Sequence, residues 1–339
     1  MVFCPRLSRR AAVAAVTLCL LHAHGANAQA PTPGKLEDII VLTPAPPTLP
    51  GFSPWILAQQ KGYFRDEGLN VNLVAANGGG VDVAKMVGAG AALAGSSVGD
   101  APLLLRANGI PIKVVAVLGG RSLMQVAVAA DNDKIKSPAD LRGKTVTAGT
   151  YSDSIYYSFL GMLAKAGLKR SDLNVQAAGP TGVWQLFAQG KADAMIGTPD
   201  WVLAAVNAGA KVKVFQGEDY FPSLPQAIVV SDKLIADRPD LVRRLVKATL
   251  RAMKDVMDDP HAAATTFVQG VPSFAGHEPY VEQIITSYAR DVYPGQKVLG
   301  QMDVARLAAI QAFYLKEGVV RDKAPLTDFY TDQFLPGMR

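Results

Sequence analysis

Short apolar runs alternate with glycine-rich turns and amphipathic stretches from residue 39 to residue 216 of this 339-residue chain. Several runs consist almost entirely of Val, Ile, Leu and Ala, as is typical of strands buried on both faces of a sheet. We expect strands at residues 39–43, 69–75, 91–96, 112–118, 144–149, 173–178, 192–197 and 211–216. Strands that alternate with helices predict α/β units with largely parallel sheets.

Glycines mark where the intervening helices should end. Each of five glycines follows an apolar-periodic run, where a left-handed residue commonly ends a helix. They are Gly90, Gly109, Gly167, Gly190 and Gly209. Ser137 followed by Pro138 predicts an N-cap and a first-turn proline.

After Asp232 the pattern becomes helical. Apolar residues in 238–260 are spaced for one helix face, with charged residues opposite. Further helices are expected at 277–292, 302–318 and 325–335. We interpret this third of the chain as helical packing on an earlier part, not as a new domain.

The first 28 residues have the layout of a secretory signal peptide. Arg6, Arg9 and Arg10 precede an apolar run at 11–21 and the small-residue stretch GANAQA. Cleavage is expected after Ala28, with Ala30 as the second choice. The apolar run has 11 residues, whereas a membrane-spanning helix needs about 20. The sequence therefore predicts an exported chain, by the general or the twin-arginine route.

Charge and cysteine content exclude several classes of protein. Both cysteines, Cys4 and Cys19, lie in the predicted leader, which excludes a disulfide scaffold and a cysteine enzyme after cleavage. Three leader arginines contribute to the net charge of +5, so the remainder carries +2. That remainder lacks the clustered Lys and Arg of a nucleic-acid-binding surface. Its 311 residues exceed the usual size of a single core and predict two lobes.

Residues 95–99 read GSSVG and match the G-x-S-x-G pattern of a hydrolase nucleophile elbow. The same turn can hold an anion through a serine hydroxyl and a backbone N–H. A hydrolase also needs a histidine near Ser97, and after the leader the chain has only His261 and His277, both in the helical third. Anion binding therefore fits this turn better, and a secreted serine hydrolase is the alternative function.

The candidate binding residues lie in loops at the carboxyl ends of the predicted strands, where α/β proteins hold ligands. Most of these loops open a helix, whose free N–H groups and dipole would receive an anion. We expect contacts with a solute from Thr43, Phe52, Trp55, Asn77, Gly78, Ser96, Ser97, Arg121, Thr150, Tyr151, Asp153, Ser154, Thr181, Asp200 and Trp201.

Their chemistry leaves the solute open. Arg121 can pair with an anionic group or form a surface or interlobe salt bridge. Trp55, Tyr151 and Trp201 can stack on a flat ring or pack within a lobe. Asp200, if it faces the cleft, favours an amine or the N–H groups of a heterocycle.

Asp153, like Asp200, opposes an anionic solute, or it serves only as an N-cap. The tract at 77–80 reads NGGG and lacks the lysine of a P-loop and the pattern of a dinucleotide-binding turn. We expect no cofactor and no metal.

Three motifs carry a resemblance to a known family. GYFRDEGLNV at 62–71, SPADLRGK at 137–144 and GKADA at 190–194 occur in this order. The chain resembles the exported solute-binding proteins of ABC importers, in the nitrate, sulfonate, taurine and pyrimidine-precursor group. The likeness runs from about Glu37 to the C-terminus.

The resemblance implies a two-lobe, type II-like periplasmic binding protein fold, each lobe a largely parallel sheet flanked by helices. Two hinge strands would cross near 125–129 and 226–230. Lobe one would comprise 35–125 and a helical part at 230–339, and lobe two 126–229.

The implied function is transport. A monomeric periplasmic protein, not an enzyme, would close on a sulfonate, aromatic carboxylate or pyrimidine-like solute and deliver it to an inner-membrane ABC permease. Delivery to a sensory receptor is a variant. A related fungal synthase shares the fold, but its iron motif needs cysteine, which residues 29–339 lack.

Overall fold

The computed structural model describes residues 35–76 and 78–337. Leu36–Arg339 form one compact unit. The predicted signal peptide lies outside the described residues. Among the described helices, none combines the length and apolar character needed to cross a membrane.

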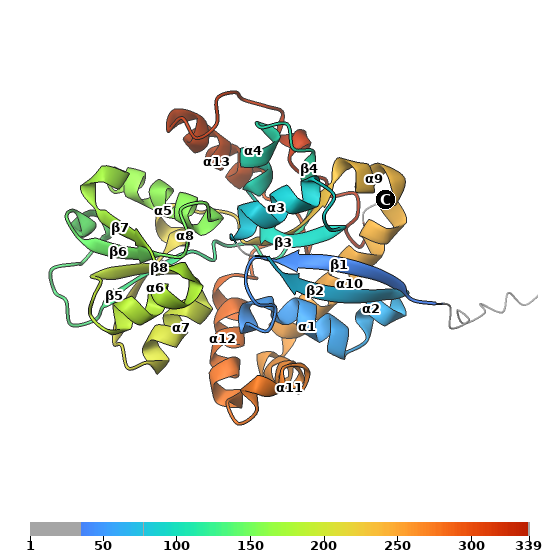
Figure 1. The fold of residues 1–339 in the computed structure, drawn as a ribbon, viewed down its shortest axis with the longest axis horizontal. Coiled ribbons are helices and arrows are strands. Elements are labelled where there is room, and N and C mark those ends of the chain that lie inside the picture. Colours follow the sequence, from blue (N-terminus) through green and yellow to red (C-terminus); the bar gives the residue numbers. More distant parts are fainter. Residues whose placement is uncertain (1–34, 77, 338–339) are drawn as a thin grey trace, which may run out of the picture. The chain divides into compact units, whose positions relative to one another are not determined.

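The first sheet has five strands in the order β2-β1-β3-β10-β4 (Figure 1). β1 pairs in parallel with β2 along its whole length, from Glu37 opposite Leu69 to Thr43 opposite Ala75. β10 lies antiparallel between β3 and β4. The strands are β1 (Glu37–Thr43), β2 (Leu69–Ala75), β3 (Ala94–Val98), β4 (Ile112–Val117) and β10 (Gln226–Ser231).

The second sheet repeats this plan in the order β7-β6-β8-β5-β9, with β5 antiparallel to both neighbours. Its strands are β5 (Gln125–Ala129), β6 (Thr145–Ala148), β7 (Asn174–Ala177), β8 (Ala194–Gly197) and β9 (Val212–Gln216). Each sheet thus has four strands running one way and one running against them. The prediction of two largely parallel sheets is confirmed.

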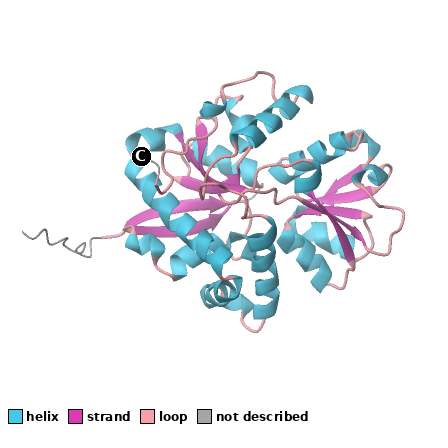
Figure 2. Ribbon diagram, turned by 180° about the vertical axis from the view of Figure 1, so that it is seen from behind, coloured by secondary structure: helices cyan, strands magenta, loops and turns pink. Residues whose placement is uncertain are grey.

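Helices cover both faces of each sheet (Figure 2). We call the first sheet with its helices the first lobe. Its helices are α1 (Ser53–Gln60), α2 (Tyr63–Asp66), α3 (Gly80–Gly88), α4 (Ala101–Arg106), α9 (Asp232–Asp237), α10 (Pro239–Asp258), α11 (Pro260–Gly270), α12 (Glu278–Asp291) and α13 (Val304–Lys316). The second sheet with its helices is the second lobe. Its helices are α5 (Ser154–Lys165), α6 (Gly179–Ala188), α7 (Pro199–Asn207) and α8 (Gly217–Tyr220).

Five short 3-10 turns complete the fold. They are η1 (Pro50–Phe52), η2 (Pro138–Leu141), η3 (Arg170–Asp172), η4 (Pro272–Phe274) and η5 (Leu326–Asp328). The helix predicted at 325–335 is wrong, because this segment forms only η5 and then runs beside β4. Val114 donates its N–H to Phe329 O and accepts the N–H of Thr331. Backbone hydrogen bonds to the edge strand β4 take the place of helical hydrogen bonds in this segment.

Most of the apolar runs form one large core, and a smaller separate cluster lies in the second lobe. Trp55 has no exposed surface and packs on Phe64, with ring centroids 6.4 Å apart. The five glycines predicted to end helices all have positive φ, between 69° and 98°. Local periodicity and glycine placement therefore determine most of the element boundaries.

The two strands predicted as crossings lie one in each sheet, β5 in the second and β10 in the first. The chain passes between the lobes just before them, at 118–124 and 221–225. These segments are joined by a hydrogen bond between the Ser122 and Ser223 hydroxyls, 2.7 Å long. Arg306 pairs with both carboxylate oxygens of Glu218, at 2.7 and 2.8 Å. The Arg306–Glu218 pair thus attaches the region between the lobes to α13.

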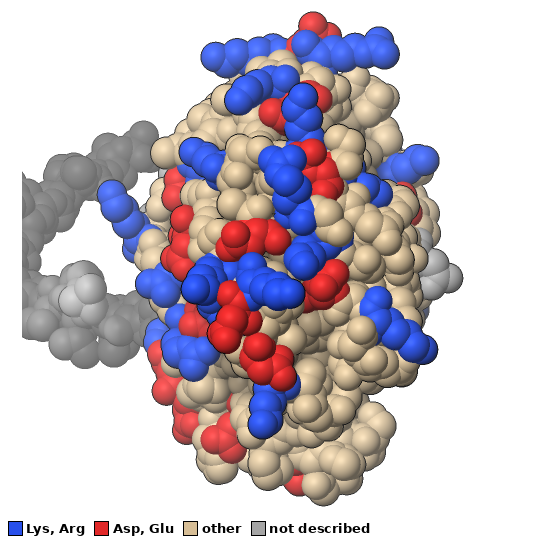
Figure 3. Space-filling model, turned by 90° about the vertical axis from the view of Figure 1, so that its left-hand side faces the viewer, with Lys and Arg blue, Asp and Glu red and all other residues tan. Residues whose placement is uncertain are grey.

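Charged side chains on the second-lobe side of the molecule are mixed in sign. Figure 3 shows Lys and Arg side chains lying among Asp and Glu side chains on this face. Mixed charge of this kind is typical of a solvated surface.

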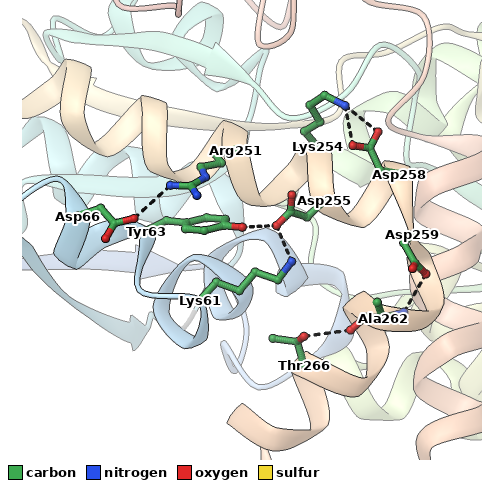
Figure 4. A network of polar contacts seen from close by, with 10 residues as sticks. All are labelled: Lys61, Tyr63, Asp66, Arg251, Lys254, Asp255, Asp258, Asp259, Ala262 and Thr266. Carbon is green, nitrogen blue, oxygen red and sulfur yellow. Dashed lines mark hydrogen bonds and ion pairs between the residues drawn. The ribbon is translucent and has the colours of Figure 1, made fainter.

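The motif at 62–71 attaches α2 to α10 (Figure 4). The Tyr63 hydroxyl donates to Asp255, which also accepts from Lys61 at 2.6 Å. The Arg251 guanidinium lies 3.7 Å from the centre of the Tyr63 ring and pairs with Asp66 at 3.1 Å. The motif therefore has a packing role in the first lobe.

We predict that Tyr63→Phe lowers the free energy of unfolding by about 1–2 kcal/mol, because it removes a hydrogen bond to a charged group while keeping the ring. Urea denaturation followed by circular dichroism measures the change. Solute affinity should stay at the wild-type value. A loss below about 0.5 kcal/mol, the usual range of surface substitutions, would contradict this role.

Candidate functional site

A cavity of about 290 Å³ lies at the carboxyl ends of both sheets. Loops after β1 and β2 and the end of β3 line it from the first lobe, and segments after β6, β7 and β8 line it from the second lobe. Leu123, the first residue of β10 and one residue of α12 complete its wall. This is the edge at which α/β sheets hold ligands.

Seven of the residues predicted from the sequence line this cavity. They are Phe52, Gly78, Ser97, Thr150, Asp153, Asp200 and Trp201. Asn77, also predicted, lies outside the described residues. The loops expected to face the cleft thus do so at 49–52, 78–80, 149–153 and 198–201.

Four predicted residues are buried beneath the cavity wall. Trp55 is part of the first-lobe core, and the Thr43 hydroxyl donates to the carbonyl of Ala45 at 2.7 Å. Ser96 and Ser154 have no exposed surface. None of the four lines the cavity. Thr43 and Ser96 lie on strands, where successive side chains point to opposite faces. Trp55 and Ser154 lie on the buried faces of α1 and α5.

Two predicted residues lie outside the cavity on the surface. Tyr151 is 47% exposed, and its hydroxyl donates to the carbonyl of Val175 at 2.9 Å. Its ring packs on Tyr156, with centroids 5.4 Å apart. Thr181 is exposed on α6. Of the three aromatic residues predicted to stack on a flat ring, Trp55, Tyr151 and Trp201, only Trp201 lines the cavity.

Arg121 is not brought to the cavity. It lies exposed in the first crossing segment, with its guanidinium 3.5 Å from the carbonyl of Arg290. Its positive charge helps to lower the pKa of Glu218, whose bonds from Arg306 and from the Ser122 N–H are the larger lowering effects. Arg121 therefore belongs to the connection between the lobes.

Sequence reasoning missed Tyr288 and Gln226, which both line the cavity. Tyr288 lies on α12, in the third of the chain interpreted as outer packing. Gln226 is the first residue of β10, which was recognised only as a crossing strand. The partners of both residues are distant in sequence, so local patterns gave no signal for either.

Asp200 is the most constrained carboxylate in the cavity. Its Oδ1 accepts hydrogen bonds from the Tyr288 hydroxyl at 2.8 Å and from Thr198 Oγ1 at 2.6 Å. Burial raises its pKa, and these two bonds act against that rise. Because α12 belongs to the first lobe and α7 to the second, the Tyr288–Asp200 bond crosses the cleft.

A second acidic group reaches the cavity at Asp153, the N-cap of α5. Its Oδ1 accepts the N–H of Ile155 at 3.3 Å, so the N-cap prediction is confirmed. Enclosure by the surrounding protein raises the pKa of Asp153 to about 6. The negative charge of Asp153 in turn contributes to a raised pKa at Asp100.

Asp100, at the start of α4, is fully buried beside the cavity wall. The Tyr314 hydroxyl donates to its Oδ2. Burial is the largest cause of a pKa raised to about 6, and the charge of Asp153 adds to it. The charge of a second-lobe carboxyl thus acts on a first-lobe carboxyl across the cleft.

Four helices at the cleft carry their own acid at the N-terminus. Asp82 lies in the first turn of α3, Asp100 at the N-cap of α4, Asp153 at the N-cap of α5 and Asp200 in the first turn of α7. A Cβ added to Gly78 would lie 1.8 Å from an Asp82 oxygen, so this side chain folds back over the turn. The helix N-termini that were predicted to receive an anion therefore already have carboxylates of the chain beside them.

Ser97 lines the cavity without the partners of a nucleophile. Its hydroxyl donates to the carbonyl of Gly80 at 2.6 Å. His261 is exposed and pairs with Glu282 at 2.9 Å, and His277 is exposed just before α12. No described histidine lines the cavity. The described residues also contain no group of three His, Cys, Asp or Glu side chains placed to hold a metal ion.

Comparison with known proteins identifies the family. The sequence profile of the NMT1/THI5-like family matches residues 49–263. This chain belongs to that family. The resemblance drawn from the three motifs, to solute-binding proteins of ABC import systems, is thereby confirmed.

Two relatives of this NMT1/THI5-like protein carry names that describe binding. The riboflavin-binding protein RibY of Chloroflexus aurantiacus is 28% identical over 318 residues, covering 91% of this chain and 90% of RibY. The periplasmic aliphatic sulphonate binding protein SsuA of Escherichia coli has a similar structure, with a TM-score of 0.67 and 18% identity. That match covers 87% of this chain and 91% of SsuA, and it confirms the two-lobe fold.

The family also includes an enzyme. The 4-amino-5-hydroxymethyl-2-methylpyrimidine phosphate synthase of Aspergillus parasiticus is 24% identical over 238 residues, covering 66% of this chain and 68% of the synthase. Membership of the family alone therefore does not decide between binding and catalysis.

Proposed function

We propose that this chain is the extracytoplasmic solute-binding component of an ABC importer. It would capture a small organic solute between its two lobes and deliver it, chemically unchanged, to an inner-membrane permease. The observation that carries the proposal is the 290 Å³ cavity, whose walls come from both lobes at the carboxyl ends of their strands. The names of RibY and SsuA support the same function.

Capture would follow from the division of contacts between the lobes. A solute in the cavity touches Phe52 and Ser97 on one side and Asp153 and Trp201 on the other. Only the closed form makes both sets of contacts, so binding shifts the population toward it. The two crossing segments would act as the hinge. We propose that it works as a monomer in the periplasm, a location that the predicted signal peptide and the periplasmic relative support.

The proposal includes no catalysis. Ser97 has no histidine beside it in the described residues, and residues 29–339 contain no cysteine for an iron motif. Treatment with a fluorophosphonate should leave Ser97 unlabelled. Covalent labelling at this residue would instead favour the hydrolase.

Closure can be tested directly because residues 29–339 have no cysteine. Met86→Cys on α3 and Val206→Cys on α7 place one exposed dye site on each lobe. Riboflavin, benzenesulfonate, benzoate and cytosine would be titrated while energy transfer between the dyes is followed. A solute that binds should bring the dyes closer. Binding with no change in transfer would contradict capture by closure.

A further inference from the structure

We infer that the solute is a flat, nitrogen-bearing ring that donates hydrogen bonds and carries no negative charge. Asp153, Asp200 and Gln226 would accept its hydrogen bonds. The inference rests on the proposed function, because it concerns what the closed cavity holds. It selects the nitrogen heterocycle from the three solute classes that the sequence left open.

The charge of the cavity wall supports this inference first. Among the described residues that line it, Asp153 and Asp200 are acidic and none is Lys, Arg or His. A third carboxyl, that of Asp100, lies close enough to Asp153 for their charges to interact. An anionic solute would add like charge to an enclosed site, where repulsion is weakly screened. A cation or a neutral donor would meet no such opposition.

The helix N-termini at the cleft also disfavour an anionic solute. The N-termini of α5 and α7 attract negative charge, but Asp153 and Asp200 already occupy them. Both carboxylates line the cavity, so their oxygens can accept hydrogen bonds from a solute. A solute therefore meets the acids before it meets the helix ends.

Unused acceptors supply the second, independent observation. Both hydrogen bonds to Asp200 go to Oδ1, and no described side chain donates to Oδ2. Gln226 is 9% exposed and lines the cavity, yet its buried Oε1 has no partner among the described residues. A buried acceptor without a donor, such as Gln226 Oε1, is unfavourable. An N–H group of a solute would satisfy it, and a second N–H could bond to Asp200 Oδ2.

The shape of the wall favours a flat ring. Trp201, Phe52 and Tyr288 all line the cavity. The indole of Trp201 lies against Gly149, where an added Cβ would approach its Cη2 to 3.0 Å. A glycine therefore lets the indole lie close to the backbone, leaving room in the cavity for stacking. The cavity volume suits a small ring system.

Three probes of the same shape test the charge preference. Benzamidine, benzamide and benzoate differ mainly in charge, from positive through neutral to negative at pH 7.5. Isothermal titration of residues 29–339 should show benzamidine or benzamide binding at least about tenfold more tightly than benzoate. A benzamidine preference would identify a cationic solute, and equal binding of the two donors a neutral one. Benzoate binding as tightly as the better donor, or no binding by either donor at millimolar concentration, would overturn the inference.

Isosteric variants test the residues. Asp153→Asn and Asp200→Asn should each weaken binding of the better donor probe by about tenfold, since each removes a charged acceptor. Gln226→Met should weaken it less. Asp133→Asn removes an exposed carboxylate of the second lobe and should leave binding unchanged. Melting temperatures would show that each variant folds. Unchanged affinity in both folded cavity variants, Asp153→Asn and Asp200→Asn, would also overturn the inference.

The two proposals fail differently. If benzoate or benzenesulfonate binds best and still brings the dyes on α3 and α7 together, the binding function stands and this solute class is wrong. If none of the probes or panel solutes binds, both proposals fail.

Discussion

Tyr288→Phe is expected to weaken solute binding by about 10–100-fold and to shift the solute-free protein toward an open form. The phenol donates to Asp200 Oδ1 across the cleft, at 2.8 Å, and both side chains are buried. Hydrogen bonds to charged groups contribute about 1.5–3 kcal/mol. Since this bond exists only when the lobes meet, its loss acts on closure more than on folding.

The substitution also changes Asp200 itself. Without the phenol, Asp200 keeps only the Thr198 hydroxyl as a side-chain donor. A carboxylate with one donor fewer is held less firmly in its position at the cavity wall. Affinity therefore falls through both closure and positioning.

Energy transfer between dyes at positions 86 and 206 measures closure, and titration with the best-binding probe measures affinity. Tyr293→Phe is the matched control, because Tyr293 is buried with its ring 5.8 Å from that of Tyr288. Among the described residues, no bond from its hydroxyl reaches the second lobe. If Tyr288→Phe behaves like this control in both measurements, the interlobe bond has no role in closure.

The sequence predicted the fold well because the relevant signals are local. Every expected strand between residues 39 and 216 is present, since buried strands consist of short Val, Ile and Leu runs. Glycines with positive φ follow the helices where expected. The tail at 325–335 was the exception, because its pairing with β4 depends on a strand more than 200 residues away.

The site was predicted only in part, for a physical reason. Strand ends identify the loops that face the cleft, and those loops supply Ser97, Asp153 and Trp201. They do not say which way a side chain turns, so Trp55 and Arg121 were assigned to the solute from position alone. Tyr288 reaches Asp200 over 88 residues of sequence. No local pattern encodes such a contact.

Four acidic residues at helix starts gave a signal in the sequence that becomes clear only when they are considered together. Asp82, Asp100, Asp153 and Asp200 each stand at the start of a predicted or recognisable helix. Considered singly, each is an ordinary cap or first-turn acid. Considered together, they already oppose an anion at the cleft, because sheet topology brings these helix ends to one edge.

Stability is expected to fall as pH rises from about 4 to about 6, with Asp100 as a principal cause. Burial raises its pKa from 3.8 to about 6 in the folded protein. Below pH 4 the carboxyl is protonated in both folded and unfolded chains, so the folded state bears no penalty. Above pH 6 it is charged in both, and the folded state bears the full cost of a buried charge. The unfolded chain binds fewer protons between these limits, so stability decreases through this window.

Asp100→Asn should remove this contribution. The amide keeps the acceptor for the Tyr314 hydroxyl but cannot ionise. We expect the variant to match the wild type near pH 4 and to exceed its unfolding free energy by about 1–3 kcal/mol at pH 7, from a pKa rise of about two units. Urea denaturation at several pH values measures the difference. Carboxylates with lowered pKa, such as Asp255 and Glu218, affect both proteins alike.

Asp133→Asn provides the control, since it removes a carboxylate from the surface of the second lobe. Its stability should follow the wild-type curve at every pH. A constant difference between Asp100→Asn and wild type from pH 4 to pH 7 would mean that Asp100 ionises in the folded protein as it does in the unfolded chain. In that case neither burial nor the charge of Asp153 would raise the pKa of Asp100 in the folded protein.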